Sequence, residues 1–462
     1  EELADLDNLN HSRRYSYADM LRKPRSFDLL YRLWNYGTTN VLEWGDPETA
    51  RRFSRTCRFG DARGFVVTAP LSLQGGMEAL DWEPRPVLKD PAFRVGPYED
   101  DRYALWYLCF GRLGYNPTCS PEVWRRVLRT MVDPPSVPAL EEALTAGGKI
   151  LPLITTAHMP VHPSLLYWVE MSTGGALFPE NNHNNRYRDT GYVNAKASDE
   201  GLFYGIADFV NDLVDRRVRG RYTPVQVAGW LRHQAGRIEI ALEDLRKANA
   251  STRFPRTRTT LNDMQMLAAL ARYHYQKTFA AIRLALWLRT GSVTELRHSR
   301  AHMAAARERW TTLTELGEIY DHDLCFQLGS PDTNARRGYW RDRLPEMERD
   351  IDRLGELIDR ADPESGGDPI PLVPITDTLG LHTMNLHAPE RWTAGEAMPI
   401  RLTVPDGFSG EVTLHYRHTN LLEGDFRAVT MRSQGSAYQA EVPSDYLTPV
   451  WDLLVYASVP LS

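Results

Sequence analysis

The chain has 462 residues and a mass of 52.7 kDa, a length that predicts about three domains of ordinary size. Its hydrophobic fraction of 42% and charged fraction of 25% are typical of folded globular proteins. The 54 basic and 60 acidic residues give a net charge of −6, which argues against a nucleic-acid-binding surface. No apolar run reaches the length of a membrane span. We therefore expect neither nucleic acid nor a membrane as a partner.

The sequence lacks the short motifs of nucleotide, zinc-protease and serine-hydrolase sites, namely the P-loop, GxGxxG, HExxH and GxSxG patterns. Its four cysteines, Cys57, Cys109, Cys119 and Cys325, show no spacing typical of zinc sites. We expect free thiols, with a Cys109–Cys119 disulfide as the alternative. The sequence therefore predicts no cofactor and no metal.

Residues 1–125 alternate short apolar runs with amphipathic segments. Residues 41–44 and 64–68 are predicted strands, and a helix is predicted to begin at Pro47 with Asp46 as its N-cap. A strand-helix order of this kind predicts parallel strands in an α/β layer. Because there are too few strands for a closed barrel, we expect the C-terminal portion of a (β/α)8-type barrel.

Residues 126–362 are predicted to be helical. Apolar residues at helical spacing, together with capping signals, predict four long helices that begin near Thr223, Thr260, Ser292 and Tyr339. Short connections between long helices favour an antiparallel bundle. Residues 151–205, before these helices, form a polar insert rich in aromatic residues.

The pattern changes to a period of two after a linker rich in Pro, Gly and Asp at residues 361–374. Short strands are predicted at residues 400–404, 412–416, 438–442 and 453–456. Residues 363–462 are therefore predicted to form a small β-sandwich of the immunoglobulin or fibronectin type.

Carboxylates beside aromatic residues are the candidates for chemistry, since glycoside hydrolysis uses two carboxyl groups around the bond that is cleaved. Glu43 and Asp46 lie at the end of the first predicted strand, where barrel enzymes place their working residues. Asp19 precedes them at the end of a possible earlier strand. The alternatives are an ion-paired or solvated Glu43, a purely capping Asp46, which we favour, and a turn-capping Asp19.

A second cluster of candidates combines His158, Trp168 and Glu170 in a stretch without regular structure, where binding residues often collect. The alternative is a hydrogen-bonded His and an ion-paired Glu at a domain interface. With Trp34 and Trp44 as further aromatic platforms, we predict that these residues and Asp46 line sugar subsites, and that Glu43 and Asp19 are catalytic.

The sequence resembles a known family in several stretches. Residues 14–25, 36–48 and 64–71 resemble the late barrel strands of large bacterial proteins similar to α-glucuronidase-type glycoside hydrolases. Residues 105–117, which end in Phe-Gly-Arg-Leu-Gly-Tyr-Asn-Pro, resemble the segment that enters their helical domain. The resemblance covers the C-terminal part of such a protein. It implies an inverting hydrolase with a Glu acid on a middle barrel strand and carboxylate bases on later strands.

This resemblance implies that the strand with the acid would lie upstream of Glu1, so we expect the chain to be part of a longer enzyme. Asp19 and Glu43 are then the candidates for the base. The chain opens without a signal peptide. A periplasmic or secreted location is expected if the full-length protein carries one.

The predicted function is that of a glycoside hydrolase-like protein, α-glucuronidase-like in type, that acts on a plant or algal oligo- or polysaccharide. One alternative is a non-catalytic carbohydrate-binding or scaffold protein, which would keep the aromatic platform without a paired acid. A polysaccharide lyase is a further alternative, suggested by the helical middle and the β-rich C-terminal region. The oligomeric state is left open.

Overall fold

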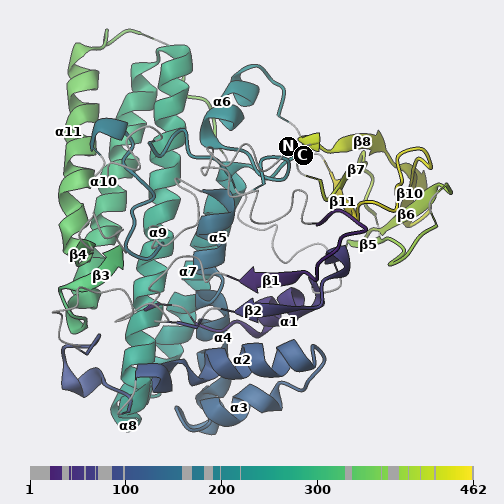
Figure 1. Cartoon of the computed structure of the whole chain (residues 1–462). Helices are drawn as coiled ribbons and strands as arrows, with labels where there is room; N and C mark the ends of the chain where they lie inside the picture. Colours follow the sequence, from purple (N-terminus) through teal and green to yellow (C-terminus); the bar gives the residue numbers. More distant parts are fainter. Residues whose placement is uncertain are drawn as a thin grey trace.

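The computed structural model describes most of the chain and all the elements discussed below. The described residues are 21–33, 41–42, 44–56, 59–67, 69–70, 86–96, 99–158, 169–181, 191–197, 199–218, 220–327, 336–365, 367–372, 384–393, 395–405, 407–420 and 423–459. They form a mixed helical and sheet fold with a helical core and small sheets (Figure 1). None of the helices within these ranges is both long and apolar enough to cross a bilayer.

The first sheet is a parallel pair of strands, β1 (Leu30–Leu33) and β2 (Gly64–Val67), connected through helix α1 (Pro47–Thr56). Leu30 pairs with Gly64 and Leu33 with Val67. The β-α-β order predicted for this part of the chain is therefore present. A barrel is not confirmed, because the sheet contains two strands within the described residues.

The strand predicted at residues 41–44 is wrong for its described residues, since Val41, Leu42 and Trp44 lie outside any strand. Side chains, rather than a neighbouring strand, bond the backbone here. Glu170 accepts the N–H groups of Val41 and Leu42, and Arg102 donates to the Val41 carbonyl. The actual strand, β1, lies earlier in the chain.

Helices dominate the middle of the chain. The shorter ones are α2 (Ala104–Tyr115), α3 (Glu122–Leu128), α4 (Val137–Gly147), α5 (Ile150–Ala157), α6 (Ile206–Val214) and α8 (Ala250–Arg253). The four long helices that were predicted are α7 (Pro224–Lys247), α9 (Pro255–Thr290), α10 (Val293–Leu316) and α11 (Leu344–Arg360). Figure 1 shows α9, α10 and α11 side by side, and a hairpin of β3 (Leu324–Gln327) and β4 (Arg336–Gly338) lies between α10 and α11 in sequence.

Capping explains where α7 begins and where α9 ends. Thr223 and Gln226 form a capping box at the start of α7, and Pro224 occupies the first helical position. Gly291, with φ +73°, ends α9 in the left-handed conformation that favours glycine. The predicted cap of α10 is not made. The Ser292 hydroxyl donates instead to the Gly367 carbonyl in the linker.

The C-terminal region contains two antiparallel sheets around a core of its own. One sheet has the order β5-β6-β10-β9 and the other the order β11-β7-β8. Their bounds are β5 (Asn385–His387), β6 (Met398–Thr403), β7 (Thr413–His418), β8 (Arg427–Thr430), β9 (Arg432–Gln434), β10 (Ala437–Val442) and β11 (Leu453–Ser458). Alternate residues such as Ile400 and Leu402 fill this core. An immunoglobulin-like topology is not confirmed.

The predicted boundaries stay predictions, but two observations bear on them. The boundary at residues 125 and 126 falls inside α3, and one hydrophobic cluster runs from Val41 to Leu354. The two C-terminal sheets have a separate cluster. A buried ion pair connects the parts of the chain that contain these two clusters. The Arg417 guanidinium on β7 binds both carboxylate oxygens of Asp199, at 3.2 and 2.6 Å.

Candidate functional site

The candidate site lies where the carboxyl ends of β1 and β2 approach the helical part of the chain. Both arrowheads point toward the helices in Figure 1. In parallel α/β layers, the segments that follow the carboxyl ends of strands supply the functional residues. Four of the predicted site residues, Asp19, Trp34, Glu43 and Trp168, lie outside the described residues.

Trp44 and Asp46 flank a close approach between the segment after Glu43 and helix α2. A Cβ atom on Gly45 would lie 2.8 Å from the Trp106 Cα, so glycine permits this contact. Trp44 is 4% exposed, and its ring centroid lies 5.7 Å from that of Tyr103. Trp44 therefore packs in the core rather than forming an open platform. Its contact with substrate stays a prediction.

Asp46 caps helix α1. Its carboxylate accepts the N–H groups of Glu48 and Thr49, at 3.2 and 3.1 Å, and the Thr49 hydroxyl at 2.6 Å. The side chain is buried. The capping role favoured from the sequence is thus present, and it engages both carboxylate oxygens. A contact of Asp46 with sugar stays a prediction.

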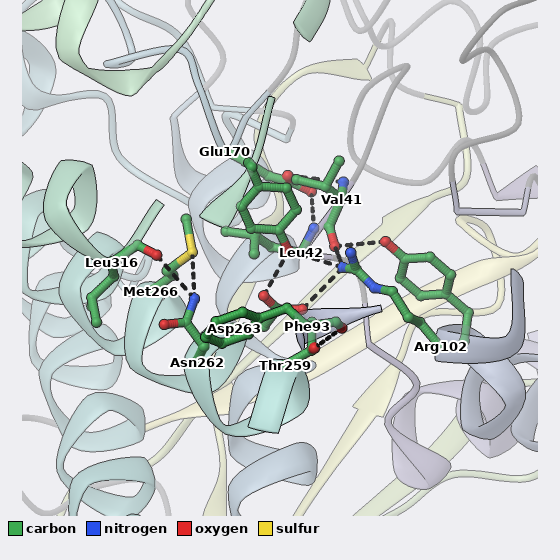
Figure 2. Close-up of polar contacts among 12 residues, drawn as sticks. Val41, Leu42, Phe93, Arg102, Glu170, Thr259, Asn262, Asp263, Met266 and Leu316 are labelled. Carbon is green, nitrogen blue, oxygen red and sulfur yellow. Dashed lines mark hydrogen bonds and ion pairs between the residues drawn. The ribbon is translucent and has the colours of Figure 1, made fainter. Parts of the chain in front are cut away.

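Glu170 binds the backbone that leads into Glu43. Its two carboxylate oxygens accept the N–H groups of Val41 and Leu42, each at 3.0 Å, and the side chain is 0% exposed (Figure 2). The Glu170 carbonyl in turn accepts the Trp340 indole N–H at 2.9 Å. Glu170 is therefore placed to position residues 41–42. Its predicted contact with substrate stays a prediction.

A buried ion pair holds the same segment from the other side. Arg102 donates to Asp263, to the Val41 carbonyl and to the Tyr320 hydroxyl, at 2.9–3.0 Å (Figure 2). Tyr320 donates to the second oxygen of Asp263 at 2.6 Å. Both charged side chains are almost completely buried. Sequence reasoning missed this network, because Arg102 and Asp263 are 161 residues apart and nothing local marks them as partners.

A second polar cluster, centred on Lys277 of α9, orders the segment that carries Glu170. The Lys277 ammonium donates to the carbonyls of Thr173 and Gly175 and to the Tyr273 hydroxyl. Burial lowers the Lys277 pKa to about 8, although nearby carboxylates act in the opposite direction. The sequence did carry a signal for this cluster: polar residues three or four positions apart within the apolar stripe of α9 lie on the same face of the helix.

Asp350 of α11 binds the end of the same segment, residues 169–181. It accepts the N–H groups of Leu177 and Phe178 and the side-chain amide of Asn181. Burial raises the pKa of its carboxyl to about 6, against the opposing effect of Lys277. Residues 169–181 are thus held by two helices, and through Glu170 they hold Val41 and Leu42.

His158, the last predicted site residue, lies at the end of α5 beside a small cavity. Its ring stacks on Tyr192 at 3.8 Å, and its Nε2 is 2.9 Å from the Gly174 carbonyl, which assigns the proton to Nε2. Burial lowers the His158 pKa to about 3, so the ring is neutral. The cavity, lined also by Tyr192, His274 and Thr278, measures about 30 Å³. That volume admits water but no sugar ring, and substrate binding by His158 stays a prediction.

No cluster suited to a metal ion, meaning three or more His, Cys, Asp or Glu side chains, occurs among the described residues. Cys109 and Cys119 are free thiols. Burial raises the pKa of Cys109, as expected for an inert thiol in the core.

Comparison with known proteins gives a structural match. No family model and no curated protein matches this sequence. The structure is similar to that of a GH138 enzyme targeting pectin rhamnogalacturonan II, with a TM-score of 0.56 and 12% sequence identity. The fold is glycoside hydrolase-like. The match covers 71% of this chain and 48% of that one, so the chain spans about half the length of the solved protein.

Proposed function

We propose that this chain acts on glycosidic bonds of an acidic plant polysaccharide, as a glycoside hydrolase. The observation that carries the proposal is the structural similarity to an enzyme that targets pectin rhamnogalacturonan II. The parallel β1–α1–β2 unit supports it, because Trp34 and Glu43 follow the carboxyl end of β1 in sequence. An α-glucuronidase-like preference is the finer form of the proposal, taken from the sequence resemblance.

In this proposal Glu43 is the base that takes a proton from the attacking water, with Asp19 as the second candidate. Trp34 and Trp168 are the platforms for sugar rings. The burial of Asp46, His158 and Glu170 supports positioning roles for these three, because their polar groups bond the protein itself. Trp44 is buried as well, against the ring of Tyr103.

The test is release of reducing ends from rhamnogalacturonan II and from glucuronate-bearing oligosaccharides by the purified full-length protein. Glu43→Gln removes the base, and turnover should fall by about 10²–10⁴-fold. Glu308→Gln, on the exposed face of α10, is the matched control and should leave turnover unchanged. Near-normal activity of Glu43→Gln would remove Glu43 from the mechanism.

A non-catalytic carbohydrate-binding role is the second candidate. This role needs the aromatic platform of Trp34 and Trp168 without a pair of catalytic carboxyl groups, and the internal contacts of Asp46, His158 and Glu170 are equally compatible with it. Binding of glucuronate-bearing oligosaccharides in titration calorimetry, with no product after long incubation, would favour this role over hydrolysis.

A further inference from the structure

A row of four polar side chains crosses the outer face of the four-stranded sheet in the C-terminal sandwich. The strand registers pair His387 with Arg401, Arg401 with Gln439, and Gln439 with Arg432. The row therefore runs across β5, β6, β10 and β9 in order. All four residues are exposed, whereas the intervening Leu402 belongs to the core on the opposite face.

The two arginines of this row have no acidic partner among the described residues, in contrast to many other surface arginines. Arg246 binds both carboxylate oxygens of Glu243, and Arg272 binds those of Glu239. The nearest carboxylate along β10 on this face is Glu441, which lies opposite Pro399, and it forms no ion pair with Arg401. In a chain of net charge −6, the row is a local concentration of cations.

The geometry of the row defines the ligand it fits. Arg401 and Arg432 stand two strand spacings apart, roughly 9–10 Å at the backbone, so they suit a ligand with repeated anionic groups. A guanidinium binds carboxylate through two parallel hydrogen bonds. Gln439, between them, offers an amide that both donates to and accepts from hydroxyl groups.

We propose that this row, His387–Arg401–Gln439–Arg432, is a binding site for an extended acidic polysaccharide, which lies across the strands with its uronate carboxylates on the two arginines. The choice of a plant polysaccharide rests on the proposed function. The site is separate from residues 41–46 and holds the polymer without taking part in the cleavage.

The experiment is retardation of the full-length protein in native gels that contain polygalacturonate, with methyl-esterified polygalacturonate as the neutral polymer of the same backbone. The double variant Arg401→Gln/Arg432→Gln should bind polygalacturonate at least roughly tenfold more weakly. The control, Arg297→Gln/Arg309→Gln, removes two exposed arginines of α10 and changes the net charge equally. It should bind as the wild type does.

Several outcomes overturn the site. These are no retardation of the wild type, equal retardation by the methyl-esterified polymer, equal weakening in both double variants, or equally tight binding of a single-stranded oligonucleotide. Unchanged thermal midpoints establish that the variants are folded, as expected for exposed positions. Reducing-end release is measured on the same samples. Binding through the row without hydrolysis would contradict the proposed function alone, and hydrolysis without binding would contradict this site alone.

Discussion

Three buried carboxylates around the candidate site serve mainly to bind backbone N–H groups. Glu170, Asp46 and Asp350 each accept at least two of them. Buried backbone amides need such acceptors wherever a segment passes outside regular structure. At the residue scale, the irregular segments around the candidate site therefore depend on a few buried side chains.

Glu170→Ala should lower the free energy of unfolding by about 2–5 kcal/mol, because it leaves the Val41 and Leu42 amides buried without their acceptor. Urea denaturation of the full chain measures the change. The control Glu308→Ala, on an exposed helix face, should stay within about 0.5 kcal/mol of the wild type. A loss of that small size in Glu170→Ala would contradict the positioning role.

His158 makes stability depend on pH. Its pKa is about 3 in the folded chain against 6.5 as the ordinary value, so the unfolded chain binds more protons between these values and stability falls as the pH drops below 6.5. Burial lowers the pKa of His274 in the same direction. Asp350, whose pKa is raised from 3.8 to about 6, acts oppositely between those values, since there the folded chain binds more protons.

His158→Gln keeps an amide donor for the Gly174 carbonyl but removes the titration. The loss of stability between about pH 7.5 and about pH 5 should therefore shrink by about 2 kcal/mol relative to the wild type, that is, about 1.4 kcal/mol for each unit below 6.5. Urea midpoints at the two pH values measure it. An equal loss in both proteins would show that His158 does not titrate in this way.

At the scale of elements, the long helices and strands β2, β6, β7, β10 and β11 follow from local patterns. The helices dock through one hydrophobic core, whereas the C-terminal sheets also contact the rest of the chain through polar groups. The two C-terminal sheets contact the rest of the chain through Arg417 and Asp199 and through Asp452, which binds Lys23 and the Gly60 N–H. A Cβ on Gly201 would lie 2.5 Å from the Arg417 guanidinium, so glycine makes room for the ion pair.

Removing one partner of this buried pair should be costly. Arg417→Ala and Asp199→Ala should each lower the free energy of unfolding by about 3–5 kcal/mol, since each leaves an uncompensated charge. The double variant should lose clearly less than the sum, and a double-mutant cycle in urea measures this coupling. Additive losses would contradict a direct pair at the joint.

At the scale of the whole molecule, one core runs through the β1–α1–β2 unit and the helices, and the two C-terminal sheets have their own. We therefore expect the C-terminal sheets to stay attached through their polar contacts after the linker is cut. A specific protease site inserted between residues 363 and 364, which are both exposed, tests this. The two pieces should co-elute in size-exclusion chromatography for the wild-type joint and separate with Arg417→Ala. Separation in both cases would place the attachment in the linker alone.

The sequence by itself determined the long helices and the change to a period of two after residue 374, because both are local properties of neighbouring residues. Thr223 and Pro224 marked a helix start, and Asp46 a cap, for the same reason. The tertiary structure alone decided which charges meet. Arg102 with Asp263, Glu170 with Val41, and Arg417 with Asp199 join residues more than 100 positions apart, and no local pattern encodes such pairs. The tertiary structure also decided that residues 41–42 are not a strand. Glu170 accepts their N–H groups and Arg102 donates to the Val41 carbonyl, so these backbone groups are bonded without a neighbouring strand.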